Sequence, residues 1–227
     1  MGNSDFVGGL FSESDSPLAS LLSGVSSLRM ITGLISLWQK LARRFFNSGI
    51  FEVLDYESTI TLEDKHGEHA TFKKHEKVCY LQDNVIAYQD QAWGDGSILK
   101  DYRCKPGFPV DRYRCGYKTH ILISLREVKS RGDIDDFNIE WRMDKGFTSK
   151  TGFWATEISH STQQMSVTLV FPKDRPPITL LSKERNSQKS ILIDANLKMQ
   201  LPDGRWSITW KKERPRQYEQ YILQWEW

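Results

Sequence analysis

This chain of 227 residues has few cysteines, little net charge and no recognisable catalytic motif. Three cysteines, Cys79, Cys104 and Cys115, are too few, and odd in number, for a disulfide-stapled scaffold. No C-x-x-C pair is present, which argues against a redox motif and a zinc ribbon. Cys104 and Cys115 stand in the near-repeat YRCKPGFPVDRYRC and could face each other across a hairpin. Free thiols are the favoured interpretation, and a disulfide is the alternative.

The net charge of +2 gives the whole chain no strong field for attracting nucleic acid, so we do not expect nucleic acid as a partner. Two Arg/Pro clusters, 173–177 and 211–216, could form a basic patch, but interleaved Asp and Glu dilute it. The N-terminus also lacks the basic region that begins a signal peptide. The sequence therefore predicts a cytoplasmic protein, either free or attached to a membrane.

Candidate chemistry is sparse. His66, His69 and His75 form the densest histidine group, and a solvated hairpin tip is favoured over a metal site there. The loop 131–136 carries Asp133, Asp135 and Asp136 but lacks the glycine and glutamate of a calcium loop. Residues 159–161, Ser-His-Ser, lack the G-x-S-x-G turn of a nucleophile elbow. We therefore predict no catalytic, cofactor-binding or metal-binding residue, and a protein that is not an enzyme.

The N-terminal part of the chain has a different pattern from the rest. Residues 1–16 are rich in Gly and Ser, which predicts a flexible segment. Ser16 and Pro17 are a suitable helix start, and 17–48 is expected to be an amphipathic helical region. Its apolar face rotates by roughly half a turn between 18–28 and 30–46, which predicts two helices with a break between Gly24 and Arg29.

The second helix concentrates the positive charge of the chain. Residues 1–28 carry a charge of −3 and 29–46 carry +4, which leaves +1 for 47–227. The helix combines a cationic polar face with a wide apolar face, a composition typical of helices that lie in a membrane interface. The residues predicted to bind a membrane or partner are Arg29, Ile31, Leu34, Leu37, Trp38, Lys40, Leu41, Arg43, Arg44 and Phe45.

Three explanations for this amphipathic region remain open. It could pack against the rest of the chain, as most amphipathic helices do. It could lie on or insert into a membrane with anionic lipid, where Lys and Arg would attract the headgroups. It could also form a homo-oligomer or bind a protein partner.

From Ile50 onward the hydrophobic period changes from 3.6 to 2. About a dozen short strands are expected, among them 51–64, 70–81, 85–93, 111–119, 120–128, 191–199 and 218–227. Turn signals separate them, so 50–227 is predicted to be a mainly antiparallel β-sandwich, or a partly open barrel. Trp206 and Trp210 should form an aromatic cluster with Tyr221, Leu223, Trp225 and Trp227 of the last strand.

These observations lead to two functional hypotheses. The first is a non-enzymatic β-sandwich interaction module whose N-terminal cationic helix associates with or inserts into a membrane. Such a module could act as an oligomeric effector. The second is a recognition module whose helices pack on the β domain and whose strand-end loops bind a protein or a ligand.

Overall fold

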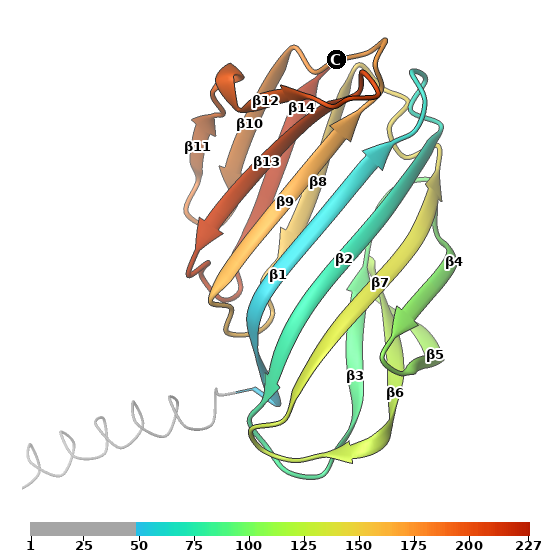
Figure 1. Cartoon of the computed structure of the whole chain (residues 1–227), viewed down its shortest axis with the longest axis vertical. Coiled ribbons are helices and arrows are strands. Elements are labelled where there is room, and N and C mark those ends of the chain that lie inside the picture. The colour runs from blue at the N-terminus through green and yellow to red at the C-terminus, as the bar shows by residue number, and fades with distance from the viewer. Residues whose placement is uncertain (1–48) are drawn as a thin grey trace, which may run out of the picture. The chain divides into compact units, whose positions relative to one another are not determined.

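The computed structural model describes residues 49–227, so the predicted segment 1–16 and helical region 17–48 lie outside the described residues. The described part is almost entirely strand, and its one helical element is the 3-10 turn η1 (Ala195–Leu197). This confirms a mainly β fold in which period-2 sequences form strands. Figure 1 shows the strands arranged as one long sheet with two smaller sheets against it.

The long sheet has seven strands. Their spatial order is β12 (Lys198–Gln200), β13 (Trp206–Glu213), β9 (Gln164–Phe171), β1 (Phe51–Leu62), β2 (His69–Tyr80), β7 (Ile134–Asp144) and β4 (Ser97–Lys105). Neighbouring strands are antiparallel except for β1 and β9, which run parallel. Side chains on one face of this sheet are buried, and those on the other face are mostly polar.

Two smaller sheets pack on the buried face. One has the order β11 (Lys189–Leu192), β10 (Thr179–Glu184), β14 (Gln220–Glu226) and β8 (Thr151–Glu157). The other has the order β3 (Val85–Ala92), β6 (Lys118–Lys129) and β5 (Phe108–Cys115). All pairs within these two sheets are antiparallel, so the described part is sandwich-like.

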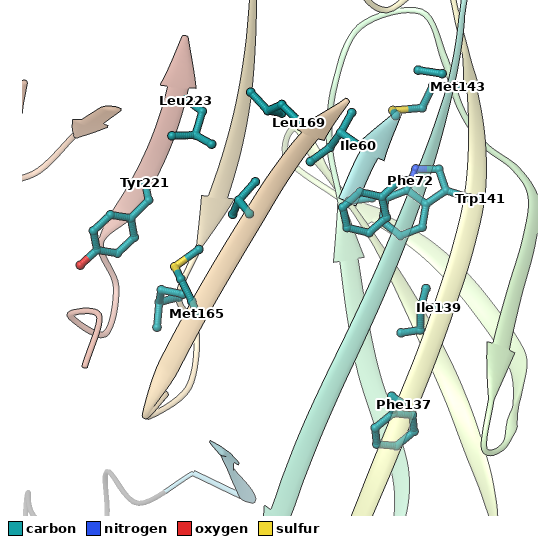
Figure 2. Packing of buried hydrophobic residues seen from close by; sticks show 14 of the residues in the cluster. Ile60, Phe72, Phe137, Ile139, Trp141, Met143, Met165, Leu169, Tyr221 and Leu223 are labelled. Carbon is teal, nitrogen blue, oxygen red and sulfur yellow. The ribbon is translucent and has the colours of Figure 1, made fainter. Parts of the chain in front are cut away.

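The core between the layers is strongly aromatic. Phe72 of β2 and Trp141 of β7 lie beside each other (Figure 2), and their ring centroids are 3.9 Å apart. Trp225 of β14 meets Phe171 of β9 edge to face, and Trp210 of β13 contacts Tyr221 of β14. Tyr221, Leu223, Trp225 and Trp227 are all buried, and Trp206 and Trp210 pack half-buried against the same core. The predicted aromatic cluster is confirmed in part, since Trp210 contacts Tyr221 whereas no aromatic pair joins Trp206 to the last strand.

Two strand predictions are wrong in detail. The segment 111–119 was expected to be one strand, but β5 ends at Cys115 and β6 starts at Lys118. Gly116 has a φ of 61°, a left-handed conformation that glycine adopts without a Cβ clash, and it makes the turn between them. The segment 191–199 was also expected to be one strand. It divides into β11, η1 and β12 because the Asp194 carboxylate accepts a hydrogen bond from the backbone N–H of Asn196.

All three cysteines are free thiols, which confirms the favoured interpretation. Cys104 is buried in β4, whereas Cys115 is exposed at the end of β5. Burial, together with the nearby Asp90, raises the pKa of the Cys104 thiol to about 12, so this thiol stays protonated.

Candidate functional site

Charged side chains occupy inward positions on two facing strands. Lys74 and Glu76 of β2 follow Phe72 at period 2, so they point to the same buried face as that aromatic ring. Asp90 of β3 lies two residues after the buried Tyr88 and points toward the same space. The fold therefore brings three ionisable groups from two sheets into the core, a position that such groups occupy only when paired.

Lys74 joins the two carboxylates. Its Nζ lies 2.8 Å from Glu76 Oε2 and 2.7 Å from Asp90 Oδ1. The Tyr88 hydroxyl donates to Glu76 Oε2 at 2.7 Å, and the Tyr102 hydroxyl donates to Asp90 Oδ2 at 2.8 Å. Each carboxylate thus pairs with the ammonium and accepts one phenol hydrogen bond, which offsets much of the cost of burying it.

The protonation states of this cluster follow from its burial and charges. Burial alone would lower the pKa of Lys74, but Asp90 and Glu76 outweigh it and raise the pKa well above its ordinary value. Burial and Glu76 raise the pKa of Tyr88 well above its ordinary value. Burial and Asp90 do the same to the pKa of Tyr102. At neutral pH Lys74 is therefore an ammonium, and both tyrosines are neutral donors.

A cavity of about 110 Å³ adjoins the cluster, between the long sheet, β3 and β8. One buried water needs roughly 10–15 Å³ of cavity volume, so this cavity has room for several waters or one small organic molecule. Its aromatic lining consists of Tyr56, Phe72, Tyr88, Trp93, Trp141 and Trp154. The half-buried Gln91, Trp93 and Ser159 also line it, and the Gln91 amide donates to the Ser159 hydroxyl at 2.8 Å.

Two residues that line the cavity carry polar atoms without a hydrogen-bond partner among the described residues. They are Thr156, whose hydroxyl is buried, and Trp154, whose indole N–H is also buried. The Thr156 hydroxyl lies near the Tyr56 phenol but without the geometry of a hydrogen bond. Buried donors without partners are rare in folded proteins, and these two atoms have less than 1 Å² of accessible surface each, so they lie behind the cavity wall.

His160 closes one side of the cavity. Its ring stacks on Phe51 with centroids 4.1 Å apart, and burial lowers the pKa of its imidazole. The neighbouring Ser159 donates no hydrogen bond to this imidazole and instead accepts one from Gln91. The serines and histidine of 159–161 thus form no nucleophile–base pair in the described structure.

The other candidate residues stabilise turns and strand pairs. The Asp64 carboxylate accepts hydrogen bonds from the backbone N–H groups of His66, Glu68 and His69 in the β1–β2 turn. Partial burial would raise the pKa of Asp64, but these hydrogen bonds lower it to about 2. His75 faces Asp136 across β2 and β7 at 3.3 Å.

The acidic loop residues are also engaged in structural contacts. Asp135 pairs with Lys129 at 2.9 Å and accepts a hydrogen bond from the Tyr80 hydroxyl, while Asp133 accepts one from the backbone of Ser130. Within residues 49–227 no group of three or more His, Cys, Asp or Glu side chains is placed to hold a metal ion.

One basic residue of each Arg/Pro cluster contacts another part of the described chain. The Arg175 guanidinium stacks over the Trp227 ring at 3.7 Å, and Lys212 pairs with Glu184 at 2.7 Å.

All predicted membrane- or partner-binding residues, from Arg29 to Phe45, lie outside the described residues. Over the part that the structure describes, no helix is long and apolar enough to cross a bilayer.

Sequence reasoning missed the residues of the cavity. The signal was present, because Lys74, Glu76 and Asp90 interrupt strands at positions that the period-2 pattern assigns to the core. A charge at an inward position of a strand indicates a buried pair or a site. The sequence did not indicate that β2 and β3 would face each other across the sandwich.

Comparisons with known proteins assign no family. No family model matches the chain, and no curated protein matches it. Among solved structures it is similar to an M1 zinc metallopeptidase from Deinococcus radiodurans, with 8% identity, a TM-score of 0.46, and coverage of 76% of this chain and 42% of that chain. A variant of that enzyme bound to a Tyr-Ser-Ala substrate gives 9% identity, a TM-score of 0.45, and coverage of 76% and 42%. The chain thus spans less than half the length of these structures, and the likeness is too low to support a functional argument.

Proposed function

We propose that residues 50–227 are a non-enzymatic recognition module that binds a small organic ligand in the cavity between β2, β3 and β8. The observation that carries this proposal is an aromatic-lined cavity that adjoins the buried cluster of Lys74, Glu76 and Asp90. Concave, mostly apolar sites with a few polar groups are the usual form of small-molecule sites. The proposed ligand site lies between the sheets, whereas the recognition-module alternative from the sequence places binding at strand-end loops.

A binding role fits the cluster better than a catalytic one. Lys74 is held as an ammonium by two carboxylates, so its lone pair is not available for nucleophilic attack. Tyr88 and Tyr102 are neutral and already donate to those carboxylates. The remaining polar groups of the cavity can donate or accept hydrogen bonds and orient a ligand.

The test is the binding of small molecules to the full chain, measured by isothermal titration calorimetry and by tryptophan fluorescence. The probes are choline, its neutral isostere 3,3-dimethylbutan-1-ol, and propionate. Ala92, a buried residue of β3, lines the cavity, so Ala92→Leu should fill it and abolish binding. Ala87→Leu, on the opposite face of β3, is the matched control and should leave binding intact. Failure of all three probes to bind saturably would contradict the proposal.

We further propose that residues 29–46 attach this module to membranes that contain anionic lipid. The supporting observation is the segregation of charge in the sequence, since 29–46 carries +4 while 47–227 carries only +1. Trp38 and Phe45 on the apolar face suit a membrane interface. Flotation of the full chain with phosphatidylserine vesicles tests this role, and a chain that stays unbound at low salt contradicts it. Gel filtration with light scattering tests the alternative of a homo-oligomer.

A further inference from the structure

We propose that the cavity selects a small organic cation of the choline type, an inference that rests on the ligand-binding role proposed above. The first support is the charge balance of the lining residues. Lys74 contributes one positive charge, whereas Glu76 and Asp90 contribute two negative charges. Glu157 also lines the cavity, but the Lys118 ammonium beside it, at 2.6 Å, balances its charge. Among residues 49–227, the cluster and its walls therefore carry one negative charge that no Lys or Arg pairs with.

This excess charge is buried, which makes it effective. Glu76 and Asp90 are each 5% exposed or less, so water screens them poorly. The phenols of Tyr88 and Tyr102 donate hydrogen bonds to these carboxylates but bring no positive charge. An incoming cation would restore neutrality in the cavity, whereas an anionic ligand would add a second unbalanced charge.

The aromatic walls provide the second support. The Lys74 ammonium already lies 5.9 Å from the Tyr56 ring centroid and 5.8 Å from that of Tyr88. The Lys118 ammonium lies 5.3 Å from the centroid of Trp93, another ring that lines the cavity. These rings thus already face two cations of the protein itself. The stacked rings of Phe72, Trp141 and Trp154 offer further π surface toward the same cavity, and such surfaces bind alkylammonium groups.

The polar groups of the lining narrow the chemical class. The half-buried Gln91 and Ser159 line the cavity, so their amide and hydroxyl groups can hydrogen-bond a hydroxyl on the ligand. A volume of about 110 Å³ suits a head the size of trimethylammonium with a short hydroxyalkyl arm. The same head occurs in free choline and in the headgroup of phosphatidylcholine.

The experiment compares choline with 3,3-dimethylbutan-1-ol, which replaces the ammonium nitrogen by carbon and keeps the shape. We expect the full chain to bind choline at least tenfold more tightly than this isostere. Equal affinities, or binding of propionate alone, would overturn the cation preference and leave the ligand-binding proposal intact, whereas failure of choline, the isostere and propionate to bind would overturn both proposals. Vesicles of phosphatidylcholine form a second arm. If the protein binds these vesicles and free choline competes with that binding, the ligand is the lipid headgroup. If the protein binds choline but not the vesicles, the ligand is the free cation.

A charge variant tests the cause of the preference. Glu76→Gln removes the excess negative charge while it keeps an acceptor for Tyr88. The choline-to-isostere affinity ratio should fall at least fivefold, and isostere binding reports that the cavity is still formed. Glu140→Gln, on the exposed face of β7, is the control and should keep the ratio. A Glu76→Gln protein that binds the isostere and retains the full ratio would overturn the electrostatic argument.

Discussion

At the scale of single residues, the described structure depends on how Lys74 is paired. Its side chain is 7% exposed, and so is that of Glu76, while Asp90 is more deeply buried still. Replacing a whole buried ion cluster by apolar groups can be neutral, but removing one partner leaves the other charges uncompensated. Lys74 is the only cation within reach of both carboxylates among the described residues, so it is the most sensitive member.

Lys74→Met should therefore destabilise the protein strongly. We expect a loss of about 3–5 kcal/mol in the free energy of unfolding, the cost typical of a broken buried ion pair. Lys73→Met is the matched control on the next residue, because its side chain is 65% exposed and faces Glu140 at 3.8 Å. Its effect should stay within about 0.5 kcal/mol. Urea denaturation measures both variants, and equal effects would contradict a structural role for the cluster.

His160 should make stability depend on pH near neutrality. Burial lowers the pKa of its imidazole in the folded state, whereas in the unfolded state the pKa is ordinary, about 6.5. The unfolded chain therefore binds more protons below that pH, and the folded state loses stability as the pH falls through 6.5 toward the folded pKa. This one group changes the free energy of unfolding by at most about 1.4 kcal/mol per pH unit.

The measurement is the urea midpoint between pH 8 and pH 5 for the natural sequence and for His160→Gln. The variant should have a flatter profile over this range. His66→Gln, in the exposed β1–β2 turn, should reproduce the slope of the natural sequence. An unchanged slope in His160→Gln would contradict the argument.

At the scale of elements, β14 packs its aromatic side chains against those of the long sheet. Trp225 is 1% exposed and packs between Phe147 and Phe171. The opposite position on β8 is Gly152, where an added Cβ would lie 2.6 Å from the Trp225 indole. The absence of a side chain at this position lets the large indole lie directly over the neighbouring strand.

Trp225→Ala should cost about 3–5 kcal/mol in the free energy of unfolding, since it opens a large cavity in the core. Phe153→Ala is a suitable aromatic control, because Phe153 lies on neighbouring β8 but is 58% exposed. That control should change stability by less than about 1 kcal/mol. Thermal and urea unfolding distinguish the two, and a mild effect of Trp225→Ala would show that the core tolerates a void there.

The strands were largely predictable from sequence because each one carries its own period-2 signal. In β2, for example, burial alternates strictly from Ala70 to Tyr80, and the inward positions are apolar except at Lys74 and Glu76. Errors arose where backbone conformation overrode this signal, as at Gly116 and Asp194. Strand pairing was not predictable, since the parallel pair β1–β9 joins segments that are far apart in the chain.

At the scale of the whole molecule, the same non-locality explains why the cavity was missed. Lys74, Asp90 and Thr156 come from β2, β3 and β8, and no short motif contains them. In the segment 29–46, by contrast, the amphipathic pattern and the charge lie within one short stretch of sequence. Its role can therefore be tested without knowledge of its contacts.

The membrane hypothesis predicts the effect on vesicle binding of changing the basic residues and of changing the apolar face. Each basic residue near an anionic surface adds about 1 kcal/mol of attraction at low salt. Replacing Lys40, Arg43 and Arg44 by Glu should therefore abolish flotation with phosphatidylserine vesicles and leave the Tm of the β domain nearly unchanged. Trp38→Asp should weaken binding at every salt concentration, because it removes apolar burial and adds a negative charge.

If 29–46 instead packs on its own chain, the pattern inverts. Trp38→Asp would then cost several kcal/mol of stability, because it would bury an unpaired charge, whereas the three charge reversals at exposed positions would change the Tm little. Vesicle flotation and thermal unfolding of the same two variants therefore decide between membrane attachment and intramolecular packing. If the unsubstituted protein does not bind anionic vesicles, both as the full chain and after removal of residues 1–16, membrane attachment is contradicted.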